Sequence, residues 1–364
     1  MEVTPKSRNK GMDANRTVEF MLNFTKVYKQ HAGSHPVVRE AEILKLQYPA
    51  ILCEILDEDL FAGRLEWPAL SFTPQADGNE GGFGYVFNFE KTEALLNSPE
   101  ITTANKKVLI ELREYWKTEH TSYKTRQAYP QSLKEGLPSD NRTHEPGIAF
   151  PLYRIAGTHL DYKKLLTLGI NGLKEELMKK SKAVSGDSQL FYSSCISSLE
   201  TFQSVCRHYE KQAWQLSQSA ANDARRKELE DMAVALRNIT DKKPADLREA
   251  IQLSFLYCVV SGSQNYGRID DYLGEFLVAD LESGRLDWKS ALNLFAGYWR
   301  IMISRMASYD GRAIVGGKGR SNEAAADKLA LLAIETAGNV IDILPQLTLR
   351  FYKGQNPELY SKAL

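Results

Sequence analysis

The stretch DGRAIVGGKGRSNEAAADKLALLAIETAGNVIDILPQLTLRFY, residues 310–352, has the pattern of a strand, a helix and a second strand. Its first apolar run, residues 313–315, is short and is followed by two glycines, which is typical of a strand end. After Pro345 apolar and polar residues alternate, as in a strand with one packed face. We expect its polar face to line a cavity. Leu347, Leu349 and Phe351 form the apolar face, and Gln346, Thr348 and Arg350 form the polar one.

The residues between these strands predict a helix. Ser321 or Asn322 can cap its N-terminus, and Glu323 places an acid against the positive end of the helix dipole. Apolar residues then recur at helical spacing as far as Gly338, a residue type that often follows a helix end. The stretch therefore predicts one compact strand–helix–strand unit.

The glycine-rich turn GGKGRS, residues 316–321, invites comparison with a phosphate-binding loop. The P-loop pattern G-x-x-x-x-G-K-[ST] needs a lysine beside the phosphate oxygens. Counted from Gly311, Gly317 occupies that lysine position, so the register fails. A tight turn from strand to helix is the better interpretation.

Composition narrows the class of protein. The 364 residues allow two domains or one large α/β domain, and a hydrophobic content of 43% supports a sizeable core. Because 46 basic residues balance 46 acidic ones, nothing favours a nucleic-acid or membrane partner. Without an apolar leader or transmembrane run, we expect a cytoplasmic protein. The four scattered cysteines predict reduced thiols and no metal site.

The rest of the chain is mostly helical in pattern. We expect three divisions: N-terminal helices over 1–60, a loop-rich segment with one helix over 61–150, and a helical wrapper with half a barrel over 151–364. Within the second division, residues 121–147 are predicted to form a long polar loop. Helices are predicted near 19–31, 37–52, 109–116, 162–182, 189–217, 223–239, 245–260, 270–283 and 287–308, and a short strand near 85–89.

Four segments occur in an order that carries a family resemblance. They are GTHLDYKKLLTLGINGL at 157–173, LREAIQL at 247–253 followed by YGRIDDYL at 266–273, ADLESGRL at 279–286, and LPQLTLR at 344–350. Each motif alone is weak, but the ordered set is quite specific. Together they resemble the glycyl radical enzymes of the pyruvate formate-lyase type, over roughly residue 151 to the end.

The resemblance implies a helix-rich α/β fold in which this chain is the first half of a ten-stranded barrel wrapped by helices. Family members use a glycyl radical, installed by a radical S-adenosylmethionine activating enzyme, to make a thiyl radical on a cysteine at the barrel centre. The implied reaction is radical cleavage of a C–C or C–heteroatom bond in a small polar substrate, in an anaerobe. The family also implies a homodimer in the complete enzyme.

Neither radical element has a counterpart in this sequence, whose last cysteine is Cys258. We therefore expect an N-terminal portion that binds no cofactor itself, is inactive alone and needs a C-terminal partner half. A fragment, a split-gene half and a degenerate paralogue all remain open. The alternative function is a non-catalytic binding or scaffold protein with the same fold. A third interpretation is an unrelated α-rich protein that matches the motifs by chance.

The resemblance also implies a substrate pocket. Relatives place a gripping residue four positions before the Asp of the Asp-Tyr pair, where this chain has Gly157, and His159 lies two residues away. Diol dehydratases tend to carry His-Ser where this chain has Gly262 and Ser263, so we expect a roomier pocket or a different substrate. The expected substrate-binding residues are Ser263, Gln264, Asn265, His159, Asp161, Gln346 and Thr348, with Arg154 as an anion clamp.

Overall fold

The computed structural model describes residues 12–74, 84–135, 160–305, 311–342 and 344–364. The chain divides into two compact units. The first comprises residues 1–54, 64–156 and 184–201, and the second comprises residues 55–63, 157–183 and 202–364. Among the described residues, every helix is too short or too polar to span a bilayer.

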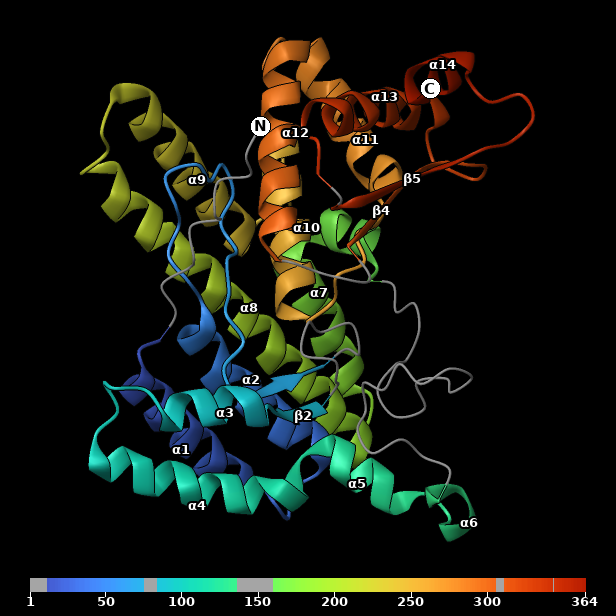
Figure 1. The fold of residues 1–364 in the computed structure, drawn as a ribbon. Coiled ribbons are helices and arrows are strands. Elements are labelled where there is room, and N and C mark those ends of the chain that lie inside the picture. The colour runs from blue at the N-terminus through green and yellow to red at the C-terminus, as the bar shows by residue number, and fades with distance from the viewer. Residues whose placement is uncertain (1–11, 75–83, 136–159, 306–310, 343) are drawn as a thin grey trace. The chain divides into compact units, whose positions relative to one another are not determined.

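The first unit is built mainly from helices around a two-stranded antiparallel sheet (Figure 1). Its first two helices confirm the predicted pair, and β2 confirms the short predicted strand with shifted bounds. Its elements are α1 (Ala14–Gln30), α2 (Pro36–Ile51), β1 (Leu70–Thr73), β2 (Gly84–Phe87), α3 (Phe89–Leu96), α4 (Thr103–Glu119), α5 (Thr121–Ala128) and α6 (Gln131–Lys134).

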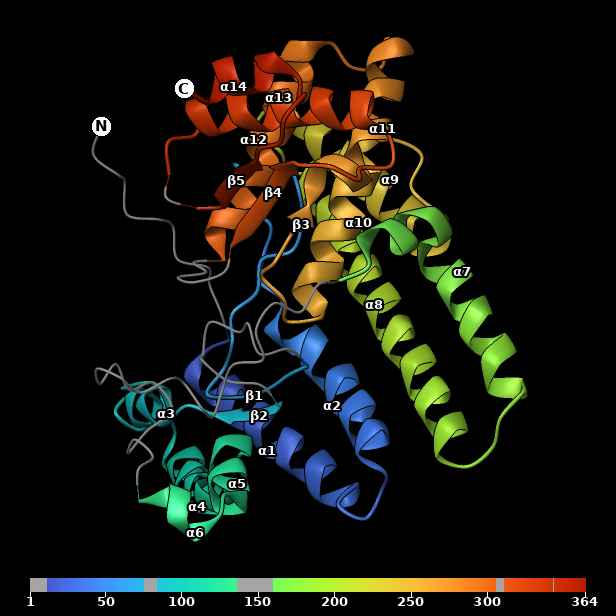
Figure 2. The ribbon, with the colours of Figure 1, turned by 90° about the vertical axis from the view of Figure 1, so that its right-hand side faces the viewer.

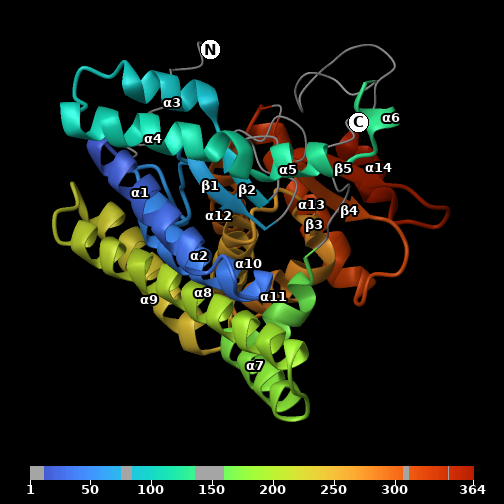
Figure 3. The ribbon, with the colours of Figure 1, turned by 90° about the horizontal axis from the view of Figure 1, so that it is seen from below.

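Aromatic packing and one buried amide organise this unit. Helix α1 packs on α2 and α4, and α2 reaches β1 (Figure 3). The indole N–H of Trp116 donates to the Thr25 hydroxyl over 2.9 Å, which satisfies a fully buried polar atom. The Gln47 side chain accepts from Phe72 N over 2.7 Å and donates to Phe72 O over 2.9 Å. A buried amide thus replaces a strand neighbour for β1.

The prediction of a long polar loop over residues 121–147 is wrong for the first part of that range. Residues 121–128 and 131–134 are helical, and residues 136–147 lie outside the described part of the chain. His120 ends α4, and its ring nitrogen accepts from Tyr123 N over 3.3 Å at the start of α5. The loop prediction rested on the polarity and proline content of the segment, and neither property reveals that His120 can cap a helix.

The second unit holds the helical wrapper and a three-stranded parallel sheet of order β3-β4-β5 (Figure 2). Helix α8 (Asp187–Ser217) runs from the first unit into it. Its other elements are α7 (Tyr162–Lys182), α9 (Asp223–Asp241), α10 (Leu247–Val260), β3 (Gly267–Arg268), α11 (Ile269–Glu282), α12 (Trp288–Ser304), β4 (Arg312–Gly316), α13 (Glu323–Asn339), β5 (Gln346–Arg350) and α14 (Pro357–Ala363). The fold is therefore helix-rich α/β.

The strand–helix–strand unit predicted from residues 310–352 is confirmed. Strands β4 and β5 are parallel, and α13 connects them. The Asn322 side chain caps α13 by accepting from Ala325 N over 3.2 Å. One expectation fails, because β5 ends at Arg350 and Phe351 does not join its apolar face. Phe351 is 58% exposed and stacks on Tyr360 instead.

Helices α11 and α13 pack closely at Gly274. A Cβ at Gly274 would lie 2.8 Å from the backbone C and O of Ala325, closer than real Cβ atoms approach. Because the neighbours are backbone atoms, they cannot move aside as a flexible side chain would. The crossing therefore requires a glycine.

We expect Gly274→Ala to lower the free energy of unfolding by about 1–3 kcal/mol, because the added methyl overpacks this crossing. Urea unfolding followed by circular dichroism measures the change. Gly338→Ala is the matched control, since nothing lies within 4 Å of a Cβ at that helical position and the substitution should be neutral or slightly stabilising. Equal effects of the two variants would contradict close packing at Gly274.

Candidate functional site at the parallel sheet

The two faces of the β3-β4-β5 sheet have opposite character. On one face, Ala313 and Val315 are fully buried, and β4 contacts α11 and α13. Strand register places the alternate residues on the other face, where none of the side chains is fully buried. These residues are Arg268 on β3, Arg312 and Ile314 on β4, and Gln346, Thr348 and Arg350 on β5. This second face is called the open face below.

A buried arginine organises the loop at the carboxyl end of β4. The Arg320 side chain has no exposed surface and forms ion pairs with Asp270 over 3.3 Å and Asp327 over 2.7 Å, and a further one with Glu323. These acids come from α11 and α13. The loop is therefore fixed to both helices by charge-assisted hydrogen bonds.

Two neighbouring carboxylates fix the two ends of the same loop. Asp270 accepts from Gly316 N over 2.7 Å, and Asp271 accepts from Ser321 N over 2.6 Å. The backbone N–H groups of Gly316 and Ser321, which a bound phosphate would need as donors, already donate to these protein carboxylates. The interpretation of residues 316–321 as a tight turn, and not as a nucleotide loop, is confirmed.

Gly316 and Gly317 are required by the shape of this turn. Their φ angles are 75° and 79°, in the left-handed region that disfavours side chains. A Cβ on Gly316 would lie 2.6 Å from Arg350 O. On the open face, Arg268 donates to Gly316 O over 2.8 Å and to Lys318 O over 3.1 Å. The guanidinium thus donates to turn carbonyls that take no part in the hydrogen bonds between the strands.

Asp270 is fully buried, although neighbouring acids in a sequence usually belong to a solvated surface. Burial raises its pKa to about 6, although the Gly316 amide and Arg320 act in the opposite direction. Its second carboxylate oxygen has no hydrogen-bond partner among the described residues. The sequence does contain a signal, because Asp270 lies three and seven residues before the buried Leu273 and Leu277, on the apolar side of α11.

The predicted residues 263–265 lie in the turn that leads into β3. Ser263 and Gln264 are buried, and the Ser263 hydroxyl accepts from Asn265 N over 3.2 Å. The Asn265 side chain accepts from Gly267 N over 3.0 Å. The main-chain carbonyl of Asn265 accepts from the Tyr162 hydroxyl over 2.8 Å. In this structure both side chains shape the turn.

A buried aromatic and thiol cluster supports this turn. Tyr272 donates to Tyr266 O over 2.8 Å and stacks on Tyr162, with ring centroids 4.8 Å apart. Arg305 donates to the Cys258 sulfur and the Tyr266 hydroxyl, each over 3.3 Å. Burial raises the pKa values of Tyr162 and Tyr272 well above the usual range, so both hydroxyls stay protonated donors.

The structure brings only part of the predicted substrate set together. Gln346 and Thr348 lie side by side on the open face, whereas residues 263–265 precede the amino end of β3. Asp161 caps α7 by accepting from Lys164 N over 3.0 Å. Arg154 and His159 lie outside the described residues. Three arginines of the open face, Arg268, Arg312 and Arg350, were not among the predicted substrate-binding residues, although Arg350 was expected on the polar face of its strand.

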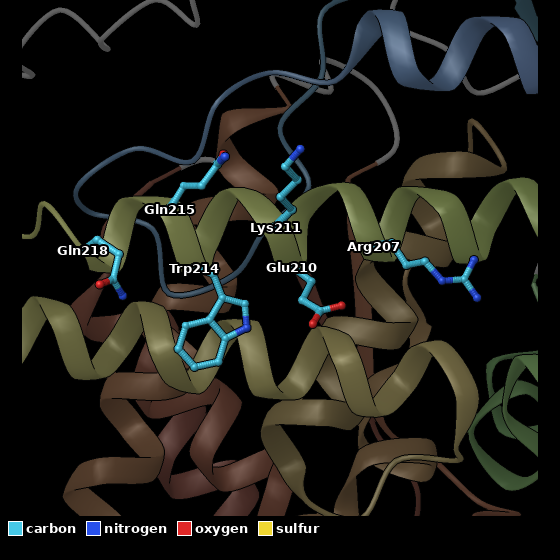
Figure 4. Close-up of a pocket in the computed structure, with 6 residues that line it drawn as sticks. All are labelled: Arg207, Glu210, Lys211, Trp214, Gln215 and Gln218. Atoms are coloured by element: carbon cyan, nitrogen blue, oxygen red, sulfur yellow. The ribbon is translucent and has the colours of Figure 1, made fainter.

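Two hollows elsewhere in the second unit are weaker candidates. One, of about 480 Å³, lies along α8 and is lined by Arg207, Glu210, Lys211, Trp214, Gln215 and Gln218 (Figure 4). Arg237 of α9 donates to Glu210 over 2.7 Å and lies over the Trp214 ring. Since its lining comes from one helix and this acid already has a partner, nothing indicates a ligand there.

The other hollow has a volume of about 680 Å³ and is lined by residues of α9 to α12 and by Leu60. Its acids already have partners within the chain: Asp280 accepts from Leu247 N, and Glu249 from Ala245 N. Within the described ranges, no group of three or more His, Cys, Asp or Glu side chains could hold a metal ion. The open face of the parallel sheet is the strongest candidate site.

We expect stability to fall as the pH rises from about 4 to about 6, through Asp270. Its pKa is about 6 in the folded chain against an ordinary 3.8, so the folded state holds the extra proton in that window. At pH 7 the shift lowers the free energy of unfolding by about 3 kcal/mol relative to its value below pH 4. Asp270→Asn should remove this fall, measured as urea unfolding free energies at several pH values.

Asp287→Asn is the control for this pH profile. Asp287 is an exposed helix cap whose pKa is lowered by its bonds to Ser290, so its removal should leave the Asp270 contribution in place. If the free energy of unfolding of Asp270→Asn falls with pH in parallel with that of the unsubstituted chain, the buried carboxyl does not hold the extra proton.

Comparison with known proteins places this geometry in context. Relatives include the (2S)-3-sulfopropanediol dehydratase of Klebsiella oxytoca, 24% identical over 95% of this chain and 45% of that protein. The isethionate sulfite-lyase of Oleidesulfovibrio alaskensis is 26% identical over 78% of this chain and 36% of its own length. The chain thus spans less than half the length of these relatives.

Solved structures agree on the fold. A structure concerned with 1,2-propanediol dehydration in Roseburia inulinivorans matches 99% of this chain and 50% of its own, with a TM-score of 0.72 and 20% identity. The B12-independent glycerol dehydratase of Clostridium butyricum matches the same shares with a TM-score of 0.70 and 20% identity. A family model described as pyruvate formate lyase-like matches residues 2–364, and the chain therefore belongs to the pyruvate formate lyase-like family of glycyl radical enzymes.

Proposed function

We propose that this chain supplies the N-terminal portion of a glycyl radical dehydratase or lyase that cleaves a C–heteroatom or C–C bond in a small polar substrate. The observation that carries the proposal is the parallel β3-β4-β5 sheet, one face of which is polar and left exposed or half-exposed by the described residues, in a chain whose relatives are dehydratases and lyases. The three strands are the start of a barrel, and the open face is its lumen. The division into residues 1–60, 61–150 and 151–364 stays a prediction.

The radical chemistry in this proposal comes from sequence outside this chain. The chain's own residues shape and line the pocket: the Arg320 ion pairs fix the loop after β4, and Gln346 and Thr348 face the substrate. A covered lumen excludes water, which a substrate radical requires. A small-molecule substrate, an activating enzyme, a homodimeric assembly and a cytoplasmic location complete the proposal.

The outer edge of β5 supports continuation of the sheet. Gln346 N donates to Gly311 O over 2.6 Å, so the backbone groups of Gln346, Thr348 and Arg350 face β4. The N–H and C=O groups of Leu347 and Leu349 then point to the opposite edge, because these directions alternate along a strand. In the described residues the sheet ends at β5. Such an edge is a template for a further strand.

Electron paramagnetic resonance tests the catalytic part of the proposal. The chain is co-expressed with a polypeptide that supplies the rest of the barrel, and both are exposed anaerobically to a radical S-adenosylmethionine activating enzyme. We expect a glycyl radical signal and dehydratase or lyase turnover only when both parts are present. An assembled complex without a radical signal would favour the alternative, a non-catalytic scaffold paralogue.

We expect the isolated chain to self-associate through the β5 edge, with Leu347→Pro reducing the light scattering. Proline removes the outward N–H of Leu347 and spares the bonds to β4. Ile341→Ser is the comparison variant, because Ile341 is 93% exposed and its loss removes apolar contact without touching the edge. A monomeric chain, or scattering reduced by Ile341→Ser alone, would argue against edge pairing.

A further inference from the structure

Residues 55–63 belong to the second unit, although the chain on both sides of them belongs to the first. They form no helix or strand. Nevertheless, Ile55 and every residue from Asp59 to Gly63 are buried. This segment, with the sequence ILDEDLFAG, is called the latch below. A buried segment without regular structure needs hydrogen-bond partners for its backbone groups.

Two glutamines supply such partners near the two ends of the latch. The buried Gln252 side chain of α10 accepts from Ala62 N and donates to Ala62 O, each over 2.9 Å. Gln212 of α8 accepts from Ile55 N over 2.8 Å. An amide that bonds both the N–H and the C=O of one residue takes the place of a neighbouring strand, so these helices bind the main chain of the latch.

Two arginines bind carbonyls between those ends. Arg225 of α9 donates to Leu56 O and to Asp59 O, each over 2.8 Å. Arg248 of α10 donates to Leu60 O over 3.2 Å. The latch carries three acids and no base, so its charge is opposite to that of the two arginines. Such complementarity favours the correct partner over others.

The apolar side chains of the latch pack closely on α10 and α12. Phe61 is fully buried and meets the Tyr298 ring edge to face. A Cβ on Gly297 of α12 would lie 2.8 Å from the Leu60 Cβ, and a Cβ on Gly63 would lie 2.6 Å from an aromatic ring of α10. The residues of α8, α9, α10 and α12 that contact the latch are called the latch site below.

A short antiparallel bridge closes the base of the latch within the first unit. Leu52 pairs with Leu65, and Cys53 N donates to Arg64 O over 2.9 Å. The two ends are thus held together without help from the latch site, and the entropic cost of closing the loop is already met. Release of the latch therefore requires no change at its base.

We propose that the latch site is a peptide-binding site and that the latch is its resident, releasable ligand. The site binds a short acidic segment with a Leu-Phe pair: side chains of the helices bond its main chain, and close packing selects its apolar residues. Leu60 also lines the hollow of about 680 Å³ described above, so release of the latch opens that hollow further. This binding role is independent of the proposed catalysis.

Hydrogen exchange of the unsubstituted full chain, followed by mass spectrometry in low urea, tests whether the latch is releasable. We expect the buried amides of residues 55–63 to exchange at least about tenfold faster than those of α9 and α10, because the latch opens without unfolding the helices. Exchange of the latch in step with α10 would show that it is an inseparable part of the core, and would overturn the proposal.

A substitution in the latch site tests the hydrogen bonds that hold the latch. Gln252→Leu should raise latch exchange by at least a further factor of about ten while α9 changes less, because Ala62 loses both partners. Gln215→Leu is the matched control, since Gln215 is an exposed glutamine on α8. Equal effects of the two variants would contradict a latch held by Gln252.

Fluorescence anisotropy tests the latch site as a binding site in trans. The probe is a labelled peptide of residues 54–65, EILDEDLFAGRL, titrated into the full-length variant Leu60→Ala/Phe61→Ala. We expect it to bind this variant at least about tenfold more tightly than the unsubstituted chain, in which the latch occupies the site. Binding should weaken as salt is added, because acids of the peptide face arginines.

A peptide of the same composition in scrambled order is the control for the probe. No measurable binding of the probe to the folded variant, or equal binding of the scrambled peptide, would overturn the proposal. Circular dichroism shows whether the double variant is folded. Because the exchange measurement on the unsubstituted chain needs no substitution, it decides the proposal even where that variant does not fold.

Discussion

The second unit depends on the buried guanidinium of Arg320. It lies between Asp270 on α11 and Asp327 on α13, and Asp270 in turn accepts from Gly316 N at the end of β4. One side chain thus joins two helices and a strand. Removing one partner of such a buried pair typically costs about 3–5 kcal/mol, since it leaves an uncompensated charge. The helices that Arg320 joins, α11 and α13, also pack closely at Gly274.

The two ends of the parallel sheet are stabilised by different chemistry. At the carboxyl end, ionised groups fix the loop after β4. At the amino end of β3, neutral side chains bond the main chain: Tyr162 and Tyr272 donate to carbonyls, and Asn265 accepts from Gly267 N. The one charged group of that cluster among the described residues, Arg305, donates to the Tyr266 hydroxyl and the Cys258 sulfur. Burial raises the pKa values of Tyr162 and Tyr272 well above the usual range, so these phenols stay protonated at physiological pH. The open face lies between these two fixed ends.

Much of the fold could be predicted because its signals are local. Alternation after Pro345 and the apolar run before Gly316 identify two strands, and helical spacing identifies the helix between them. The same reasoning missed α3, α5 and the two-residue strand β3. Short elements of this kind have little periodicity of their own, and β3 exists because Tyr266 N donates to Arg312 O over 2.9 Å, a contact across more than forty residues.

The sequence by itself determined the family, the helix-rich class and the polar face of β5, because ordered motifs and residue periodicity are properties of the chain. Only the tertiary structure decided which polar residues remain available to a ligand. Ser263 and Asn265 look like donors in the sequence, yet the turn uses both. Asp270 and Asp271 are neighbours, yet packing buries the first completely and leaves the second partly exposed. Burial and hydrogen bonding depend on distant elements, and no local pattern encodes them.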